Sequence, residues 1–93
     1  MMAKKEDLTG WIIEAIASYN GEATIVQICK HVWDHHENDL RQSGDLFYTW
    51  GYDIRWAAQW LRDNDYLKPV EACKRGVWVT TAKGLEAFTV GIP

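Results

Sequence analysis

The stretch that decides the fold is DIRWAAQWLRDNDYLKPVEACKRGVWVTTAKG, residues 53–84. Its first part has apolar residues at helical spacing. At 100° per residue, Ile54, Ala57 and Leu61 fall on one side of a helix, and long polar residues fall on the opposite side. The spacing therefore predicts an amphipathic helix over residues 52–64.

The second part of this stretch has the pattern of a β-hairpin. Residues 66–72 read as a strand, in which Pro69 marks an edge position or a bulge. Residues 73–76, Cys-Lys-Arg-Gly, predict a tight turn in which Gly76 supplies a positive φ. The alternating residues 77–80 then predict the return strand.

The first half of the chain contributes two further helices. Residues 8–19 carry apolar side chains at helical spacing, and Asn20-Gly21 ends that helix. Thr24 caps a second helix, which fades over residues 34–39, and residues 22–24 can pair as a short strand. Residues 37–51, interrupted by Ser43-Gly44, favour a loop or a short helical turn folded onto the core.

Together these elements predict an α+β, mainly helical fold of the winged helix-turn-helix type. It would have a three-helix core, a β-hairpin wing and a C-terminal helix over residues 82–88, capped by Thr80 or Thr81. The sequence has no internal repeat, low-complexity segment or linker, so we expect one domain over residues 1–93. In a winged helix-turn-helix domain, one helix can enter a DNA groove while the hairpin lies against the phosphates.

Charge is unevenly distributed along the chain, whose formal net charge is −3. Residues 1–49 carry four Lys or Arg and eight Asp or Glu, whereas residues 50–83 carry six Lys or Arg and four acids. Domains that bind nucleic acids usually carry a net positive charge. In this chain only one part has an excess of basic residues, so a basic side rather than a basic domain is expected. The six Trp residues supply large buried areas, which favours folding at this small size.

Apolar runs in the sequence are too short to cross a bilayer, and the N-terminus lacks the pattern of a signal peptide. Cys29 and Cys73 belong to no CxxC pair, so reduced thiols are expected. We therefore expect a cytoplasmic protein without membrane contact.

A set of short motifs resembles the N-terminal domain of Mrr-type restriction endonucleases. The motifs cover residues 43–84, somewhat under half of the chain, and the similarity before them is topological. They are Ser43-Gly44, Trp56-Ala57, Trp60-Leu61, Tyr66-Leu67, the run Arg75-Gly76-Val77-Trp78-Val79-Thr80, and Lys83-Gly84.

The resemblance implies a winged-helix fold of bacterial or phage type with a DNA-recognition role beside a separate nuclease domain. No constellation of nuclease carboxylates and lysine follows the last predicted helix, so we expect a stand-alone recognition domain. The chain departs from the family where a Gly usually stands between helix and strand. Asn64-Asp65 occupies that corner, and both residue types tolerate a left-handed backbone.

Candidate DNA contacts lie on the predicted helix 52–64 and on the hairpin. Arg55, Gln59 and Arg62 follow the spacing i, i+4, i+7, which aligns three long donors suited to base edges and phosphates. The alternative is an ordinary solvated face, and Asp53 and Asp63 on the same helix would repel phosphates. The full predicted DNA-binding set is Tyr52, Arg55, Gln59, Arg62, Lys68, Lys74 and Arg75.

Other constellations have simpler interpretations. Trp56 and Trp60 are expected to close the core, although stacking on unpaired bases is an alternative. His31 and His35 have an i, i+4 spacing that can hold zinc, but histidines also suit the C-terminal end of a helix without any metal. Cys29 lies two residues from His31 and would face another way on a helix. We expect no metal, no cofactor and no enzymatic activity.

The partner expected from this sequence is double-stranded DNA. The alternative is a protein partner or a second copy of the chain, bound through the acidic first half and exposed aromatic side chains. Trp78 alternates with Val77 and Val79, and if it lies outward beside Trp56, an apolar patch would favour such a protein contact.

Overall fold

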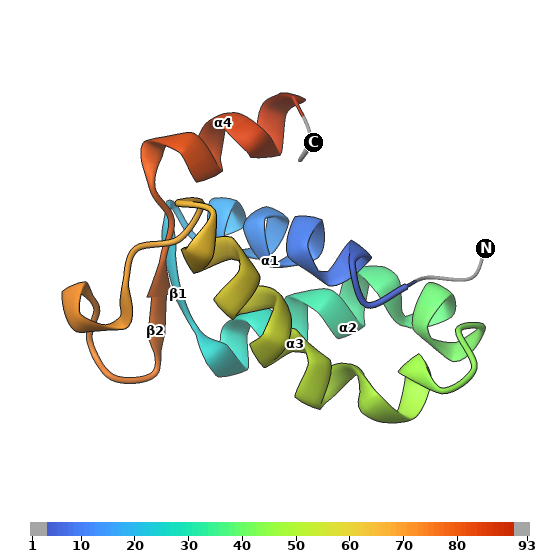
Figure 1. Cartoon of the computed structure of the whole chain (residues 1–93). Helices are drawn as coiled ribbons and strands as arrows, with labels where there is room; N and C mark the ends of the chain where they lie inside the picture. Colours follow the sequence, from blue (N-terminus) through green and yellow to red (C-terminus); the bar gives the residue numbers. More distant parts are fainter. Residues whose placement is uncertain (1–3, 91–93) are drawn as a thin grey trace.

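Helix α1 (Asp7–Ser18) forms the centre of the hydrophobic core in the computed structural model, which describes residues 4–90 (Figure 1). Helices α2 (Ile25–Arg41), α3 (Leu46–Asp63) and α4 (Ala82–Val90) all pack against it. The predicted helix over residues 8–19 is confirmed to within one residue. Its buried face consists of Leu8, Thr9, Ile12, Ile13, Ala15 and Ile16.

A short two-stranded antiparallel sheet lies at one end of the helices. Strand β1 (Glu22–Thr24) pairs with β2 (Val77–Val79), and Ala23 stands opposite Trp78. Before β1 the chain turns through Asn20 and Gly21, whose φ values of 65° and 103° lie in the left-handed region. The expected short strand over residues 22–24 is therefore confirmed, and it joins the two halves of the chain.

Helix α2 begins with a capping box and is longer than the sequence suggested. Thr24 Oγ1 accepts a hydrogen bond from the Gln27 backbone nitrogen at 3.1 Å, and Gln27 Oε1 accepts one from the Thr24 nitrogen at 2.9 Å. The prediction that this helix fades over residues 34–39 is confirmed in part, because the helical geometry breaks within that range but the helix resumes and continues to Arg41. Helical geometry is broken at His36, where φ is −129° and ψ is 18°.

Helix α3 begins at Leu46, six residues before the predicted start at Tyr52. The turn around Ser43-Gly44 does separate α2 from α3, but the expected loop or short turn over residues 37–51 is wrong, because most of it is helix. Aromatic packing explains the extension. The rings of Phe47 and Trp50 lie 6.4 and 6.1 Å from the ring of Trp33 in α2.

The segment between α3 and β2 is a loop with little strand structure. The predicted strand over residues 66–72 is wrong, since only Leu67 forms a bridge, opposite Thr80, and Val70–Ala72 is one turn of 3-10 helix. Pro69 precedes that turn and has no N–H to donate to a strand partner. The predicted turn at residues 73–76 is confirmed, with Gly76 at a φ of 77°.

The architecture is α+β and mainly helical, with four helices and two strands described in residues 4–90. The element order α1-β1-α2-α3-β2-α4 is compatible with a small winged-helix-like fold. The predicted last helix over residues 82–88 corresponds to α4, in which Thr81 Oγ1 accepts a hydrogen bond from the Gly84 nitrogen at 3.0 Å. Within this described part, none of the helices combines the length and the apolarity required to cross a bilayer.

Candidate nucleic-acid interface

Helix α3 is held by its apolar side, which leaves its polar side facing solvent. Ile54, Ala57 and Leu61 are buried in the core, as their spacing predicts. Arg55 and Gln59 are exposed and Arg62 is half-buried. The exposed side of α3 thus lies next to the loop at residues 69–76, on the side of the molecule that carries β2.

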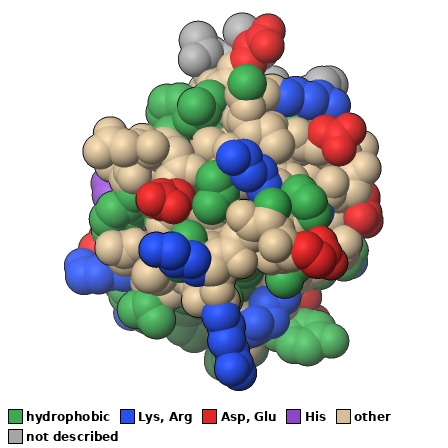
Figure 2. Space-filling model, turned by 90° about the vertical axis from the view of Figure 1, so that its left-hand side faces the viewer, with side chains coloured by type: hydrophobic (Ala, Val, Ile, Leu, Met, Phe, Trp, Pro, Cys, Tyr) green, Lys and Arg blue, Asp and Glu red, His purple; other side chains and the backbone are tan. Residues whose placement is uncertain are grey.

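Four of the predicted contact residues come together around one hollow. Arg55 and Arg62 from α3, with Lys74 and Arg75 from the turn, line a cavity of about 290 Å³ that also contacts Trp78. We call Arg55, Arg62, Lys74 and Arg75 the basic cluster. Figure 2 shows Lys and Arg side chains over this side of the molecule, with separate acidic side chains between them.

Several contacts fix the basic cluster in place. The backbone nitrogen of Ile25, the first residue of α2, donates to the Gly76 carbonyl oxygen at 3.0 Å and so anchors the turn. The Arg62 guanidinium lies 5.5 Å from the centre of the Trp78 ring, a cation–π contact. Trp78 itself points inward and is only 7% exposed, while Val77 and Val79 are half-buried. The Trp78 ring therefore positions a guanidinium and adds no exposed apolar patch.

Arg55 also influences the neighbouring helix. Burial raises the pKa of the Cys29 thiol in α2, and the positive charge of Arg55 opposes part of that rise. Cys29 is a free, half-buried cysteine, so a raised pKa keeps it in the neutral thiol form. Arg55 and Ile25, the first residue of α2, line the same hollow.

The remaining predicted residues lie outside the hollow. Tyr52 is 79% exposed on the open side of α3. Gln59 donates from Nε2 to Asp63 Oδ1 at 2.9 Å, so its amide is engaged within the helix. Lys68 is exposed at the start of the loop, where its backbone nitrogen donates to the Val79 carbonyl oxygen at 2.9 Å.

The carboxylates on α3 do not neutralise the basic cluster. Asp53 accepts a hydrogen bond from Thr49 Oγ1 at 2.8 Å, and Asp63 accepts the one from Gln59. The ion pairs described within residues 4–90 involve Lys30, Arg41 and two histidines, but no member of the basic cluster. Its four positive charges are therefore available to an anionic partner.

Tyr48 is an exposed residue of α3 that the sequence reasoning missed. It is 83% exposed and lies one helical turn before Tyr52. The missed signal was the aromatic run Phe47-Tyr48, in which one ring packs inward and the next faces solvent. The predicted helix began too late to include it.

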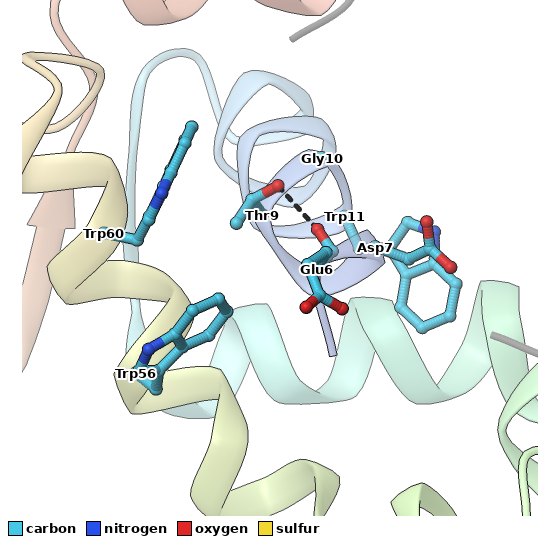
Figure 3. A pocket seen from close by; sticks show the side chains of 7 residues that line it. All are labelled: Glu6, Asp7, Thr9, Gly10, Trp11, Trp56 and Trp60. Carbon is cyan, nitrogen blue, oxygen red and sulfur yellow. Dashed lines mark hydrogen bonds between the residues drawn. The ribbon is translucent and has the colours of Figure 1, made fainter. Parts of the chain in front are cut away.

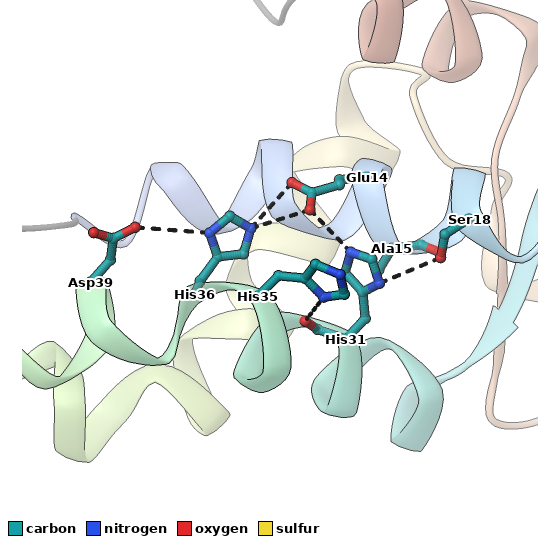
Figure 4. Close-up of polar contacts among 7 residues, drawn as sticks. All are labelled: Glu14, Ala15, Ser18, His31, His35, His36 and Asp39. Carbon is teal, nitrogen blue, oxygen red and sulfur yellow. Dashed lines mark hydrogen bonds and ion pairs between the residues drawn. The ribbon is translucent and has the colours of Figure 1, made fainter.

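The three histidines bind protein groups rather than forming a metal site (Figure 4). His31 Nε2 and His36 Nε2 contact the Glu14 carboxylate at 3.0 and 3.1 Å. His35 stacks on His31 at 4.0 Å and donates from Nδ1 to the His31 carbonyl oxygen at 2.9 Å. Across residues 4–90, no group of three or more His, Cys, Asp or Glu side chains is arranged to hold a metal ion.

The two tryptophans in the second half of α3, Trp56 and Trp60, differ in burial. Trp60 is half-buried, packs against the core and stacks on Tyr66 with ring centres 5.9 Å apart, as expected. Trp56 is 38% exposed, so the expectation that it closes the core is wrong.

Comparison of the chain with protein-family models, with curated proteins and with solved structures finds no match.

Proposed function

We propose that this chain is a winged-helix domain that binds double-stranded DNA, with α3 as its recognition helix. The turn at residues 73–76 is the tip of the wing and contacts phosphates. The observation that carries the proposal is the basic cluster, in which two arginines of α3 and two cations of the turn line one hollow and form no ion pair with another residue of the described range 4–90. The proposal requires neither a cofactor nor catalysis.

The chemistry of these side chains suits a duplex. A guanidinium presents a planar fork of donors that matches phosphate oxygens and the acceptor edge of guanine. The major groove is wide enough for an α-helix, and the exposed Tyr52 and Gln59 lie on the side of α3 that would enter it. Gln59 exchanges its bond to Asp63 for a base edge in this arrangement.

The resemblance to the N-terminal domain of Mrr-type restriction endonucleases adds support of a different kind. Two of its motif residues pack inside this structure: Trp78 is buried, and Gly84 lies against Tyr66 and Thr80. The motif therefore supports the winged-helix architecture more than it supports a ligand. A DNA-recognition role beside a separate nuclease follows from the resemblance and is part of the proposal.

Duplex binding can be tested by fluorescence anisotropy with a mixed-sequence DNA at 50 and 200 mM salt. Replacing Arg55 and Arg62 together by Ala is expected to weaken binding by at least about tenfold, because each lost fork removes a charge-assisted contact. Lys30→Ala is the matched control, since it removes an exposed cation of α2 that pairs with Asp34.

Two results would contradict the proposal. One is an affinity that is unchanged by the Arg55 and Arg62 substitutions, and the other is binding that does not weaken with salt. Circular dichroism of the double variant separates loss of contact from loss of fold. Both arginines lie outside the buried core, so the variant is expected to keep its helices.

A second candidate function is a protein contact, favoured by exposed rings on two helices. Tyr48 and Tyr52 of α3 are largely exposed, and so, to a lesser degree, are Leu85 and Phe88 of α4. A second copy of the chain bound on α3 would cover the side that faces the DNA groove. Sedimentation equilibrium of the free protein separates the two, because a dimer that covers α3 dissociates on adding duplex or excludes it.

A further inference from the structure

A second hollow lies on the opposite flank of α3, between that helix and the start of α1 (Figure 3). Its volume is about 470 Å³, within the roughly 300–1,000 Å³ of small-molecule sites. Trp56 and Trp60 project from α3 toward α1. We call it the indole hollow, and its lining is Glu6, Asp7, Thr9, Gly10, Trp11, Trp56 and Trp60.

The lining of the indole hollow combines aromatic faces with negative charge. The indole rings of Trp56 and Trp60 carry the negative face of the aromatic quadrupole, and Glu6 and Asp7 add two carboxylates. Trp11 also lines the hollow, but its ring is stacked on His36. No Lys or Arg is among these lining residues. The carboxylates would repel a phosphate. They would attract a cation, and the indole rings would contact its apolar surface.

The structure itself shows that this aromatic surface takes an ammonium group. Lys5 Nζ lies 4.5 Å from the centre of the Trp56 ring. Distances below about 6 Å mark a cation–π contact, and Trp is the strongest partner for it. The Trp56 ring therefore already binds one alkylammonium ion from its own chain.

The indole hollow is open because of Gly10. A Cβ atom placed on Gly10 would meet nothing within 4 Å, so the floor of the hollow at this helical position is empty. Trp56 is exposed enough to be reached from solvent, while Trp60 is held by its stack on Tyr66. The hollow therefore has one partly exposed wall, Trp56, and one packed wall, Trp60.

We propose that the indole hollow binds an alkylammonium cation, such as a methylated lysine side chain or a small quaternary amine. The cation replaces the Lys5 ammonium on the Trp56 ring, Trp60 contacts its methyl groups, and Glu6 compensates the charge. The site is separate from the basic cluster, which lies on the wing side of α3 and attracts the opposite charge. The two sites can therefore be tested independently.

The first test titrates the full chain with choline and follows the indole N–H signals by NMR. The control ligand is 3,3-dimethylbutan-1-ol, which has the same shape but no charge. Saturable shifts of the Trp56 and Trp60 signals are expected with choline, with at least about fivefold weaker binding of the neutral analogue. Equal binding of the two, or no saturable shift with either, overturns the proposal.

The second test fills the hollow from its floor. Gly10→Leu is expected to abolish choline binding, and Gly51→Leu is the matched control. Gly51 is also a helical, exposed glycine where an added Cβ meets nothing within 4 Å, but it lies in α3 outside the lining. Choline binding that survives Gly10→Leu would overturn the proposal, provided that circular dichroism shows an intact fold.

A third measurement identifies the source of the cation and separates this site from duplex binding. N-acetyl-trimethyllysine amide is titrated in the same way. Tighter binding than choline assigns the hollow to a protein side chain, and weaker binding assigns it to a free small cation. Gly10→Leu is expected to leave duplex affinity unchanged, so failure at one site does not imply failure at the other.

Discussion

Glu14 is the carboxylate on which two of the three histidines converge, and it joins α1 to the bend in α2. Its partners, His31 and His36, stand 17 and 22 positions later in the chain. The His36 ring also stacks on Trp11 at 4.0 Å and lies 3.9 Å from Asp39. Partial burial is the largest single influence and raises the pKa of Glu14, but the hydrogen bonds and charge interactions with His31 and His36 together outweigh it, so the net pKa is lowered.

The lowered pKa of Glu14 predicts acid sensitivity. Its contribution to stability is fully present above the unfolded-state pKa of about 4.3 and is lost as the pH falls through the lower folded-state pKa. Glu14→Gln is therefore expected to destabilise the fold by roughly 1 kcal/mol at pH 6–7 and to have less effect at pH 3. Urea unfolding across this pH range measures the difference.

Glu22→Gln is the control for this prediction, because Glu22 is exposed in β1 and belongs to none of the ion pairs described in residues 4–90. An equal loss of stability in both variants at pH 6–7 would show that Glu14 has no special role. A loss in Glu14→Gln that is as large at pH 3 as at pH 7 would contradict the ionic mechanism.

At this scale the sequence could indicate which residues are unusual but not which ones meet. The i, i+4 spacing of His31 and His35 was visible, and it suggested either zinc or a helix end. Glu14 lies on another helix, and no pattern of sequence spacing connects it with the histidines of α2. The clustering of the four basic side chains could be predicted from the sequence, because the predicted turn follows the predicted helix closely. These side chains are Arg55, Arg62, Lys74 and Arg75.

Element boundaries show where local signals were overruled by packing. The sequence suggested an end to α2 near His36 because polar and histidine residues gather there, yet the helix continues past a local bend. Ion pairs Lys30–Asp34 and Glu37–Arg41, at 2.6 and 2.7 Å, flank the bend. The predicted start of α3 falls too late because residues 37–51, interrupted by Ser43-Gly44, favour a loop or a short helical turn, whereas Phe47 and Trp50 pack on Trp33 and extend the helix.

Gly84 is required by the close approach of α4 to the end of α3. A Cβ atom at this position would collide with Thr80 Oγ1 and with the Tyr66 backbone oxygen. The Tyr66 oxygen already accepts a hydrogen bond from Thr80 Oγ1 at 3.2 Å, so neither atom can move freely. Gly84→Ala is expected to destabilise the fold by about 2–3 kcal/mol, measured as a lower urea midpoint.

Gly51→Ala provides the comparison for Gly84→Ala within the same protein. Gly51 also lies in a helix, but an added Cβ there meets open space. Since Ala loses less backbone entropy than Gly, this change is expected to be neutral or to stabilise by about 0.5–1 kcal/mol. If the two variants had the same midpoint, the steric argument for Gly84 would be wrong.

At the scale of the whole molecule, the net charge of −3 opposes the proposed binding of DNA, which would depend on the basic cluster on one side. Binding through that side should therefore depend steeply on salt. Lys74→Ala and Arg75→Ala are each expected to weaken binding to all duplexes alike and to reduce the slope of log K against log salt by about 1. Anisotropy with two unrelated duplexes at several salt concentrations measures both quantities.

The two classes of contact can be separated in the same experiment. Arg55→Ala is expected to change the ratio of affinities for the two duplexes, because the proposed role of α3 is to read base edges. If Lys74→Ala changed that ratio and Arg55→Ala did not, the assignment of helix and wing would be reversed. Lys30→Ala should change neither the ratio nor the slope.

The pairing of β1 with β2 has a consequence for the order in which the chain assembles. Helix α1 packs against α2, the next helix in the chain, and against α3, whereas this sheet must close a loop that contains both α2 and α3. We therefore expect the sheet to form late in folding and to open early in unfolding, before the helices separate. The arginines of α3 would then reach their folded positions early in folding, and the turn at residues 73–76 would reach its folded position only in the last step.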